Sequence, residues 1–410
     1  MTSVAGPDPE GARVRHVSTR PENAHQAALL RRLRDDGPIS RAELAEAVRL
    51  SRSRLAVELD RLTDLGLVES RGLAASRGGR RSALMALSSQ LRFVGVDIGA
   101  TSVDVAVTDA RMAVLAQVSE SIDVRLGPNA VLSVVLDLIG KLRADGVAAE
   151  VHGAGVGVPG PVSFRDGVPV SPPLMPGWGQ FPVRSVLAQH LGCPVSLDND
   201  VNIMALGEMH AGLARTVQDL LFVKVGTGVG CGIVVNGRVY RGASGSAGDI
   251  GHIRVDDDGP VCSCGNVGCL EAHFSGAALA RDATAAARAG RSDLLAGRLT
   301  ADGALSGADV AAAAAEGDAV SVDLVRRGGQ RLGQLLAGLV SFFNPDMVVL
   351  GGQVASGLGH PLLAELRSVV YRRSLPLATG NLPIVLSELG AQAGVVGAAR
   401  MISDEVFSHE

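Results

Sequence analysis

The sequence predicts an α/β protein in which a small α+β module precedes a larger α/β domain made of two lobes. Apolar residues recur at helical spacing between residues 23 and 65, and two strand-like runs follow. Two later segments, at 93–107 and 223–235, each have the order strand, glycine turn, strand and lie about 130 residues apart. Residues 274–343 are rich in alanine and predict helices.

Bulk composition indicates a soluble globular protein of two to three domains. The 410 residues are 47% hydrophobic and 20% charged, and no apolar run is long enough to span a membrane. Residues 1–22 lack the apolar core of a signal peptide, and the five cysteines do not form a disulfide-like framework. We therefore expect a cytoplasmic protein that has no membrane segment.

Charge is divided unevenly along the chain. Residues 1–90 contain 15 arginines against 11 acidic residues, a balance of +4, and the remainder has 23 basic against 31 acidic residues, a balance of −8. A basic module ahead of an acidic domain suggests different partners for the two parts. Chance variation in local charge remains an alternative on this number alone.

The first 90 residues predict a tail followed by a winged helix-turn-helix. Residues 1–22 have little periodicity and predict a disordered tail. Within the domain at 23–90, helices are expected at 25–33, 41–48 and 52–65, with a turn at 36–40. Strands at about 67–70 and 82–87 flank a loop at 71–81 that is rich in Gly and Arg, which is the pattern of a two-strand wing.

Local signals support these helix boundaries. Ser40 with Glu43 three residues later forms a capping box, and Ser51 caps the third helix. Gly66 ends that helix. Arg49 is a departure, because the turn between the two helices often contains Gly.

The third helix is the predicted DNA reader, because the start of a recognition helix enters the major groove. Arginine can read guanine or grip phosphate, and wing arginines suit the minor groove or the backbone. The predicted DNA contacts are Ser51, Arg52, Ser53, Arg54, Arg77, Arg80 and Arg81. The alternative is an ordinary three-helix domain with a solvated basic face.

The two glycine turns predict a nucleotide cleft. An Asp at the end of a buried strand followed by Gly-x-Thr is how an actin-like fold opens its phosphate site, with metal-bound water on the Asp and turn amides facing phosphate oxygens. Either turn alone also fits a plain hairpin, but the pair indicates two related lobes. The candidate nucleotide residues are Asp97, Gly99, Thr101, Gly226, Thr227 and Gly228, with Gly351 and Gly352 at the adenosine position.

A polar cluster at 198–202 ends a predicted strand at the mouth of this cleft. Asp200 is placed to accept a hydroxyl proton, and Asn199 is placed to bind a polyol. An Asx-rich helix cap would explain one of the four polar residues in this cluster.

The stretch from Asp249 to Glu271 predicts a zinc site. Its three cysteines lie within eight residues, ten positions after a histidine, and imidazole and thiolate are the ligands of a closed tetrahedral zinc site. A closed site has no open position, so the zinc is expected to be structural. The ligands are His252, Cys262, Cys264 and Cys269; unrelated buried thiols are the alternative.

Together these motifs resemble the ROK family of repressors and sugar kinases, over residues 23 to about 405. The zinc stretch, Gly-x-x-Gly-His and then Cys-x-Cys-Gly-x-x-Gly-Cys-x-Glu, is the most specific element. The resemblance implies two actin-like (ribonuclease H-like) lobes over 91–410. Lobe one would span about 91–200 plus the C-terminal helix, and lobe two about 201–393.

The resemblance also implies a set of sugar contacts and some departures from the kinases. The contacts carried over are Gly160, Asn199, Asp200, Asp249, His252 and Glu271. Asp249 stands where kinases have Glu, and residues 172–174 read Pro-Pro-Leu where kinases usually carry Asn-Leu. Ser102 replaces a common Lys, and Gln353 replaces a Gly in the adenosine turn. These changes disfavour phosphoryl transfer, which depends on positioning and charge at the phosphates.

Family members with a preceding helix-turn-helix are mostly sugar-responsive regulators. The resemblance therefore implies a repressor of carbohydrate genes that binds a double-stranded DNA operator and a sugar, as a homo-oligomer (dimer or tetramer) with structural zinc. One alternative is a sugar kinase that uses ATP and Mg²⁺, with Asp200 as its catalytic base. A third hypothesis is an oligomerisation platform that no longer binds sugar.

Overall fold

The computed structural model describes residues 20–73, 83–299 and 303–409. The chain divides into two compact units, one of Met1–Ser89 with Val406–Glu410 and one of Gln90–Glu405. Most of the predicted tail and three predicted DNA contacts (Arg77, Arg80 and Arg81) lie outside the described residues.

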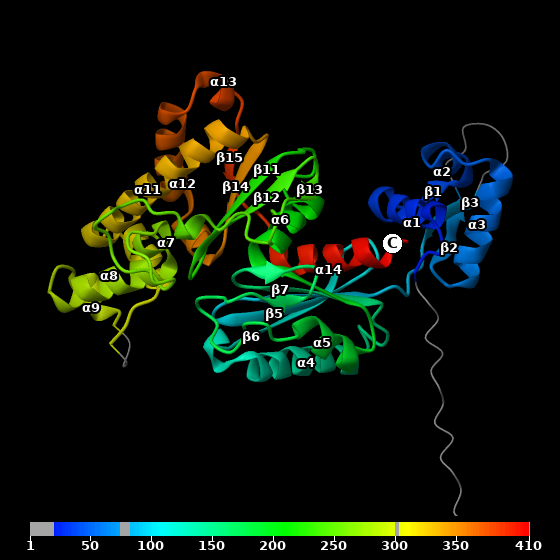
Figure 1. The fold of residues 1–410 in the computed structure, drawn as a ribbon, viewed down its shortest axis with the longest axis horizontal. Coiled ribbons are helices and arrows are strands. Elements are labelled where there is room, and N and C mark those ends of the chain that lie inside the picture. The colour runs from blue at the N-terminus through cyan, green and yellow to red at the C-terminus, as the bar shows by residue number, and fades with distance from the viewer. Residues whose placement is uncertain (1–19, 74–82, 300–302, 410) are drawn as a thin grey trace, which may run out of the picture. The chain divides into compact units, whose positions relative to one another are not determined.

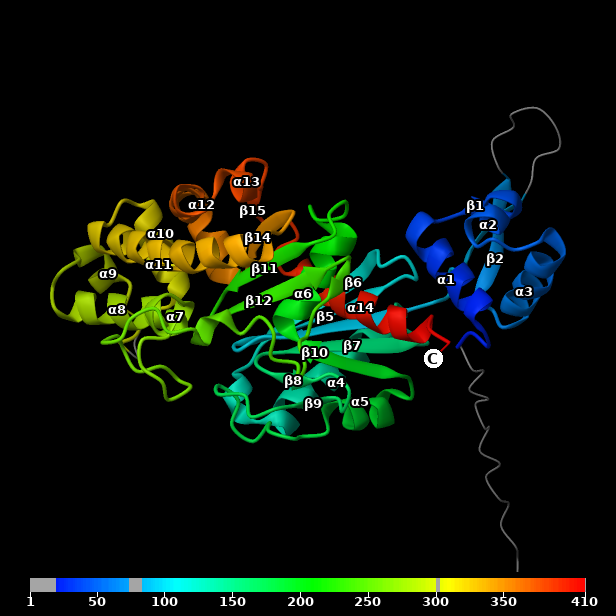
Figure 2. The same cartoon turned by 45° about the horizontal axis from the view of Figure 1, so that its top comes forward.

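The N-terminal unit packs three helices against a three-stranded sheet of order β1-β3-β2 (Figure 2). Its elements are α1 (Ala24–Asp36), β1 (Ile39–Ser40), α2 (Arg41–Ala47), α3 (Arg52–Asp64), β2 (Val68–Leu73) and β3 (Ala83–Leu87). A turn was expected at 36–40, but Ile39 and Ser40 form a short strand. Ile39 pairs antiparallel with Met85 and so adds a third strand to the wing. A two-residue strand is too short to show a period of two.

Local chemistry explains the boundaries of these helices. The capping box of Ser40 and Glu43 is present at the start of α2, and the Ser51 side chain accepts a hydrogen bond from the Arg54 amide at the start of α3. Arg49 has φ 55°, the left-handed conformation for which glycine is usually chosen. The turn therefore keeps its geometry although a non-glycine residue occupies it.

The second unit contains two five-stranded sheets, which confirms the predicted two-lobed α/β class (Figure 1). The first sheet has the order β10-β7-β4-β5-β6 and the second β13-β12-β11-β14-β15. The first contains β4 (Phe93–Ile98), β5 (Ser102–Thr108), β6 (Val114–Ser121), β7 (Gly153–Val158) and β10 (Val195–Asn199). The second contains β11 (Leu220–Val225), β12 (Val229–Val235), β13 (Arg238–Val239), β14 (Met347–Gly351) and β15 (Ile384–Leu386). A small hairpin pairs β8 (Val162–Ser163) with β9 (Val168–Pro169).

Helices cover both faces of the first sheet (Figure 1). On one face lie α4 (Pro128–Ala144) and α5 (Val183–Leu191), and on the other lie α6 (Asp200–Ala211) and α14 (Gln392–Val406). Close approach of α14 depends on strand glycines: a Cβ at Gly95 or Gly155 would lie 1.8 Å from a carbonyl oxygen of that helix.

Helix α6 joins the two lobes. It packs against β7 and β10 of the first sheet and against β11 and β12 of the second. It is buried on several sides, as a helix with apolar residues all round must be. Its first residue, Asp200, is therefore held where the two sheets meet.

The remaining helices build the outer part of lobe two. They are α7 (Leu270–His273), α8 (Gly276–Arg288), α9 (Asp293–Gly297), α10 (Gly307–Ala315), α11 (Ala319–Phe343), α12 (Gln353–Arg373) and α13 (Pro376–Thr379). Within the described part of the chain, none of the helices combines the length and the apolar character needed to cross a bilayer.

Candidate functional site

A cleft within the second unit gathers all six predicted sugar contacts. It encloses about 910 Å³ of space, part of it open to solvent. One wall comes from the ends of β7 and β10, and the other comes from the turn between β11 and β12 and the segment at 245–252. Its lining includes Gly160, Asn199, Asp200, Asp249, His252 and Glu271.

Asn199 holds the first wall together. Its side-chain amide donates to the Gly160 carbonyl at 2.8 Å, and its side-chain oxygen accepts from the Val201 amide at 2.9 Å. The residue thereby caps α6 and fixes the loop after β7. One amide hydrogen is left to face a ligand, so Asn199 combines a structural role with its predicted one.

Asp200 is paired with a lysine that the sequence argument missed. Lys224 Nζ lies 2.5 Å from Asp200 Oδ2, and the two side chains are only 17% and 7% exposed. Lys224 lies on β11, two residues before the glycine turn, and it also lines the cleft. Its rarity was an available signal, since Lys141 and Lys224 are the chain's two lysines.

Asp97 is buried and interacts electrostatically with this pair. Burial raises the pKa of its carboxyl group to about 7, although Lys224 opposes the shift. Its Oδ1 atom has no hydrogen-bond partner among the described residues, and a Cβ at Gly394 of α14 would lie 1.9 Å from Oδ2.

The predicted nucleotide residues divide into two groups. Thr227 and Gly228 line the cleft. The others, Asp97, Gly99, Thr101, Gly226, Gly351 and Gly352, are not part of its lining. The β4–β5 and β11–β12 turns do form as predicted, with the Gly99 amide bonded to the Ser102 carbonyl and the Gly226 amide bonded to the Gly228 carbonyl.

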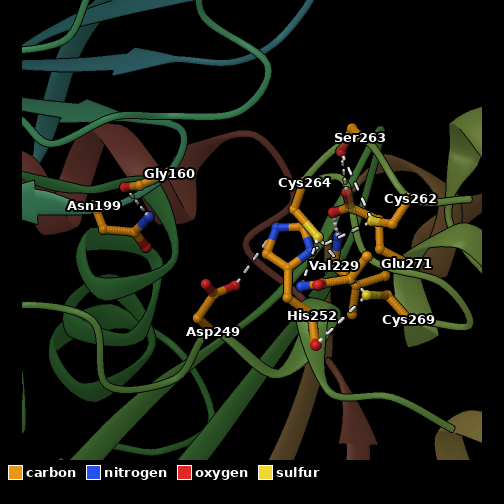
Figure 3. A network of polar contacts seen from close by, with 11 residues as sticks. Gly160, Asn199, Val229, Asp249, His252, Cys262, Ser263, Cys264, Cys269 and Glu271 are labelled. Carbon is orange, nitrogen blue, oxygen red and sulfur yellow. Dashed lines mark hydrogen bonds and ion pairs between the residues drawn. The ribbon is translucent and has the colours of Figure 1, made fainter.

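The histidine and three cysteines converge beside the cleft (Figure 3). Their ligand atoms all lie within 4.8 Å of one another. The Cys264 and Cys269 sulfurs are 3.8 Å apart, and the Cys262 sulfur is 3.5 Å from His252 Nδ1. Zn–S bonds of about 2.3 Å and Zn–N bonds of about 2.05 Å at tetrahedral angles require about 3.8 and 3.5 Å. The four groups therefore fit a metal ion such as zinc.

The cluster and the cleft share His252. Its Nδ1 atom faces the cysteines, whereas Nε2 lies 3.9 Å from Asp249 Oδ1, on the cleft side (Figure 3). A metal on Nδ1 would fix the ring and leave Nε2 directed toward a ligand.

Glu271 connects the cluster to the glycine turn. Its Oε2 atom accepts a hydrogen bond from the Val229 amide at 3.0 Å, and Oε1 accepts one from Ser263 Oγ at 3.3 Å (Figure 3). A Cβ at Gly228 would lie 2.4 Å from Oε2, so a larger residue in this turn would displace the Glu271 carboxylate.

A second residue that the sequence argument missed is Arg241. Its guanidinium contacts Asp198 Oδ2 at 2.7–2.8 Å and stacks on the Phe164 ring at 4.0 Å. The other Asp198 oxygen accepts from the Asn202 amide at 2.9 Å. Asp198, one of the four polar residues in the predicted cluster, thus accepts hydrogen bonds from both Asn202 and Arg241.

In the N-terminal unit, the start of α3 presents Arg52, Ser53 and Arg54 to solvent. Arg54 forms an ion pair with Glu58 at 2.7 Å, and the Glu58 side chain is fully buried. Gln26 donates to the same carboxylate at 2.9 Å. The Arg54 guanidinium is therefore held by a buried carboxylate, while half of the side chain remains exposed.

Two family models match the chain. The model described as ROK family matches residues 93–405, and the model described as winged helix-turn-helix DNA-binding matches residues 23–69. They cover the same two regions in which the two sheets and the three N-terminal helices lie.

Similar proteins include both regulators and kinases. A xylose repressor of Caldicellulosiruptor bescii is 31% identical over 383 residues, which is 93% of this chain and 95% of that protein. The crystal structure of a ROK family transcriptional regulator, a homologue of the E. coli MLC protein, has a TM-score of 0.79 at 27% identity and covers 93% of this chain and 95% of its own. A ROK family glucokinase of Streptomyces griseus, solved with glucose and AMPPNP, has a TM-score of 0.67 at 30% identity and covers 76% of this chain and 99% of its own.

Proposed function

This chain belongs to the ROK family, and we propose that it is a sugar-responsive repressor whose winged helix-turn-helix binds an operator. One observation carries the proposal: a chain with a DNA-binding module also holds a cleft whose polar lining residues include Asn199, Asp200, Asp249, His252 and Glu271. Convergent carboxylate, amide and imidazole groups suit the hydroxyls of a sugar. Similarity to a xylose repressor along nearly the whole chain supports the regulatory role.

The proposed ligand is a monosaccharide, and D-xylose and D-glucose are the first to test. One relative is a xylose repressor, and one similar structure is a glucokinase solved with glucose. Sugar binding would shift the equilibrium between arrangements of the two lobes. In a homo-oligomer this shift would change how the helix-turn-helix units match their half-sites.

We propose that the metal is structural zinc. All four ligands come from the protein, so the site is closed and leaves no position for a reacting water. Its role would be to hold His252 and Glu271 along one wall of the cleft.

A gel-shift experiment tests the repressor proposal. The full chain is expected to bind DNA from its own upstream region at moderate salt and to lose or gain affinity when D-xylose or D-glucose is added. Binding no stronger than to a scrambled duplex would contradict it.

The competing function is an ATP-dependent sugar kinase with Asp200 as the base. Similarity to a glucokinase and the presence of both glycine turns favour it. A coupled assay for ADP release over hexoses, aminosugars and pentoses distinguishes the two, with Asp200→Asn as the control. Turnover that this substitution abolishes would establish the kinase.

A further inference from the structure

Lys224 is a cation held inside the cleft at the junction of its two halves. It extends from β11 toward α6 of the same unit, and its ammonium contacts Asp200 at 2.5 Å. Only 17% of its side chain is exposed. A lysine this enclosed is unusual unless a carboxylate balances its charge.

Asp200 balances the charge of Lys224, and Asp97 adds to the effect. Burial alone would lower the pKa of its ammonium, but Asp200 and Asp97 outweigh burial and raise it. The lysine is therefore protonated across the physiological range. Its charge lies beside Asp200, the residue that would remove a proton from a sugar hydroxyl, and interacts electrostatically with Asp97, the residue that would hold metal-bound water.

This arrangement does not fit the Mg²⁺·ATP that the kinases of the family require. A general base must be free to accept a proton, and Asp200 is engaged by an ammonium. Phosphoryl transfer also needs a divalent cation to bridge the phosphates, and a fixed positive charge beside Asp200 repels such an ion. A lysine can instead contact phosphate directly, but here the charge of Lys224 is offset by its ion pair with Asp200, which weakens its attraction for phosphate.

We propose that Lys224 is a built-in counter-ion that takes the place of the divalent cation, so that the cleft binds its ligand without Mg²⁺ or nucleotide. The proposal rests on the proposed function for the presence of a sugar ligand. Its consequence is that the protein senses the sugar alone, independently of the ATP supply.

The test measures binding of Mg²⁺·AMP-PNP, at up to about 1 mM, to the full zinc-loaded chain by calorimetry. Wild type is expected to show no Mg²⁺-dependent binding. Lys224→Thr is expected to gain it, with affinity at least about tenfold above wild type, and Lys224→Arg is expected to behave like wild type. Lys141→Thr is the matched control, because this lysine is 61% exposed and pairs with Glu120 at the surface.

Two outcomes would overturn the proposal. One is Mg²⁺-dependent binding of AMP-PNP to wild type as tight as to Lys224→Thr. The other is a Lys224→Thr protein that has normal circular dichroism and zinc content but does not gain Mg²⁺-dependent binding of AMP-PNP. If that variant does not fold, Lys224→Met takes its place, because methionine retains the apolar stem of the lysine side chain. In addition, electron paramagnetic resonance of Mn²⁺ with wild type and AMP-PNP reports directly on binding of a divalent cation. Failure of the repressor proposal is seen separately, in the operator gel shift of wild type.

Discussion

Asp97 shows how burial and charge compete at one residue. It ends a buried strand and faces both Lys224 and Asp200. Burial raises the pKa of its carboxyl group from 3.8 to about 7, so the folded protein holds a proton there that the unfolded chain has lost. Stability from this group is therefore fully present below pH 3.8 and is lost as the pH rises through 7.

Asp97→Asn should make the protein more stable at pH 8, because a neutral amide needs no proton to remain buried. The expected gain is about 2–4 kcal/mol at pH 8, and it should shrink toward pH 5. Urea unfolding at the two pH values measures it. Asp137→Asn, on the exposed face of α4, is the control and should show no such difference. An equal effect of Asp97→Asn at both pH values would contradict the argument.

At the start of α3, Arg54 combines exposure with a buried anchor. Arg54→Ala should weaken operator binding by about 1–3 kcal/mol and relax specificity at one base pair, because the ion pair with Glu58 orients the guanidinium. Gel shifts on the operator and on single-base variants measure this. Arg326→Ala, on α11 of the other unit, is the control. An equal loss of affinity for all duplexes would instead show that Arg54 contacts a phosphate and not a base.

At the scale of elements, the metal cluster supports one side of the cleft. Cys264→Ser should lower zinc content and melting temperature, because metal binding and local folding are coupled. It should also abolish the response to sugar, because Glu271 and His252 lie on the same segment, while DNA affinity should be largely kept. Metal analysis, thermal melting and gel shifts measure these effects. The control is Cys193→Ala, because Cys193 lies outside the cluster and the variant protein should keep its zinc. A full response to sugar in a zinc-free protein would contradict the supporting role of the cluster.

Glycine allows helix α14 to pack closely against helix α6. A Cβ at Gly397 would lie 1.6 Å from the Ile203 carbonyl oxygen of α6. Gly397→Ala should therefore cost about 3 kcal/mol or more, because the backbone must move. The control is Gly338→Ala on α11, where a Cβ meets nothing within 4 Å and a gain of up to about 1 kcal/mol is expected. Similar melting temperatures for the two variants would disprove the packing argument.

At the scale of the whole molecule, the two ends of the chain belong to one unit. Val406–Glu410 groups with the first 89 residues, and the Phe407 ring is fully buried with the Arg34 guanidinium 5.8 Å from its centre. The last helix of the second unit, α14, thus continues directly into a segment of the N-terminal unit. This covalent link is a route by which a change around α14 can reach the helix-turn-helix.

Phe407→Ala in the full chain should destabilise the DNA-binding unit by about 3–5 kcal/mol. Hydrogen exchange should become faster in α1 and stay unchanged in β4 and β7. Phe342→Ala is the matched control, since that ring is 90% exposed. Unchanged exchange in α1 would show that the C-terminal segment contributes nothing to this unit.

Much of the architecture could be predicted because its signals are local. The helices of the first unit, the two glycine turns and the cluster of one histidine and three cysteines each depend on residues close together in the chain. The fold class is confirmed, whereas β1 was missed because two residues carry no periodicity. The assignments of sugar, nucleotide and DNA contacts remain predictions.

Sequence alone determined the two modules and the histidine–cysteine cluster, because spacing along the chain encodes caps, turns and chelating loops, and its family resemblance indicated residues that line the cleft. Only the tertiary structure decided that Lys224 neutralises Asp200 and that Phe407 packs with Arg34. These pairs come from different elements, and their contact depends on how helices and sheets pack. No local pattern of residues specifies that packing.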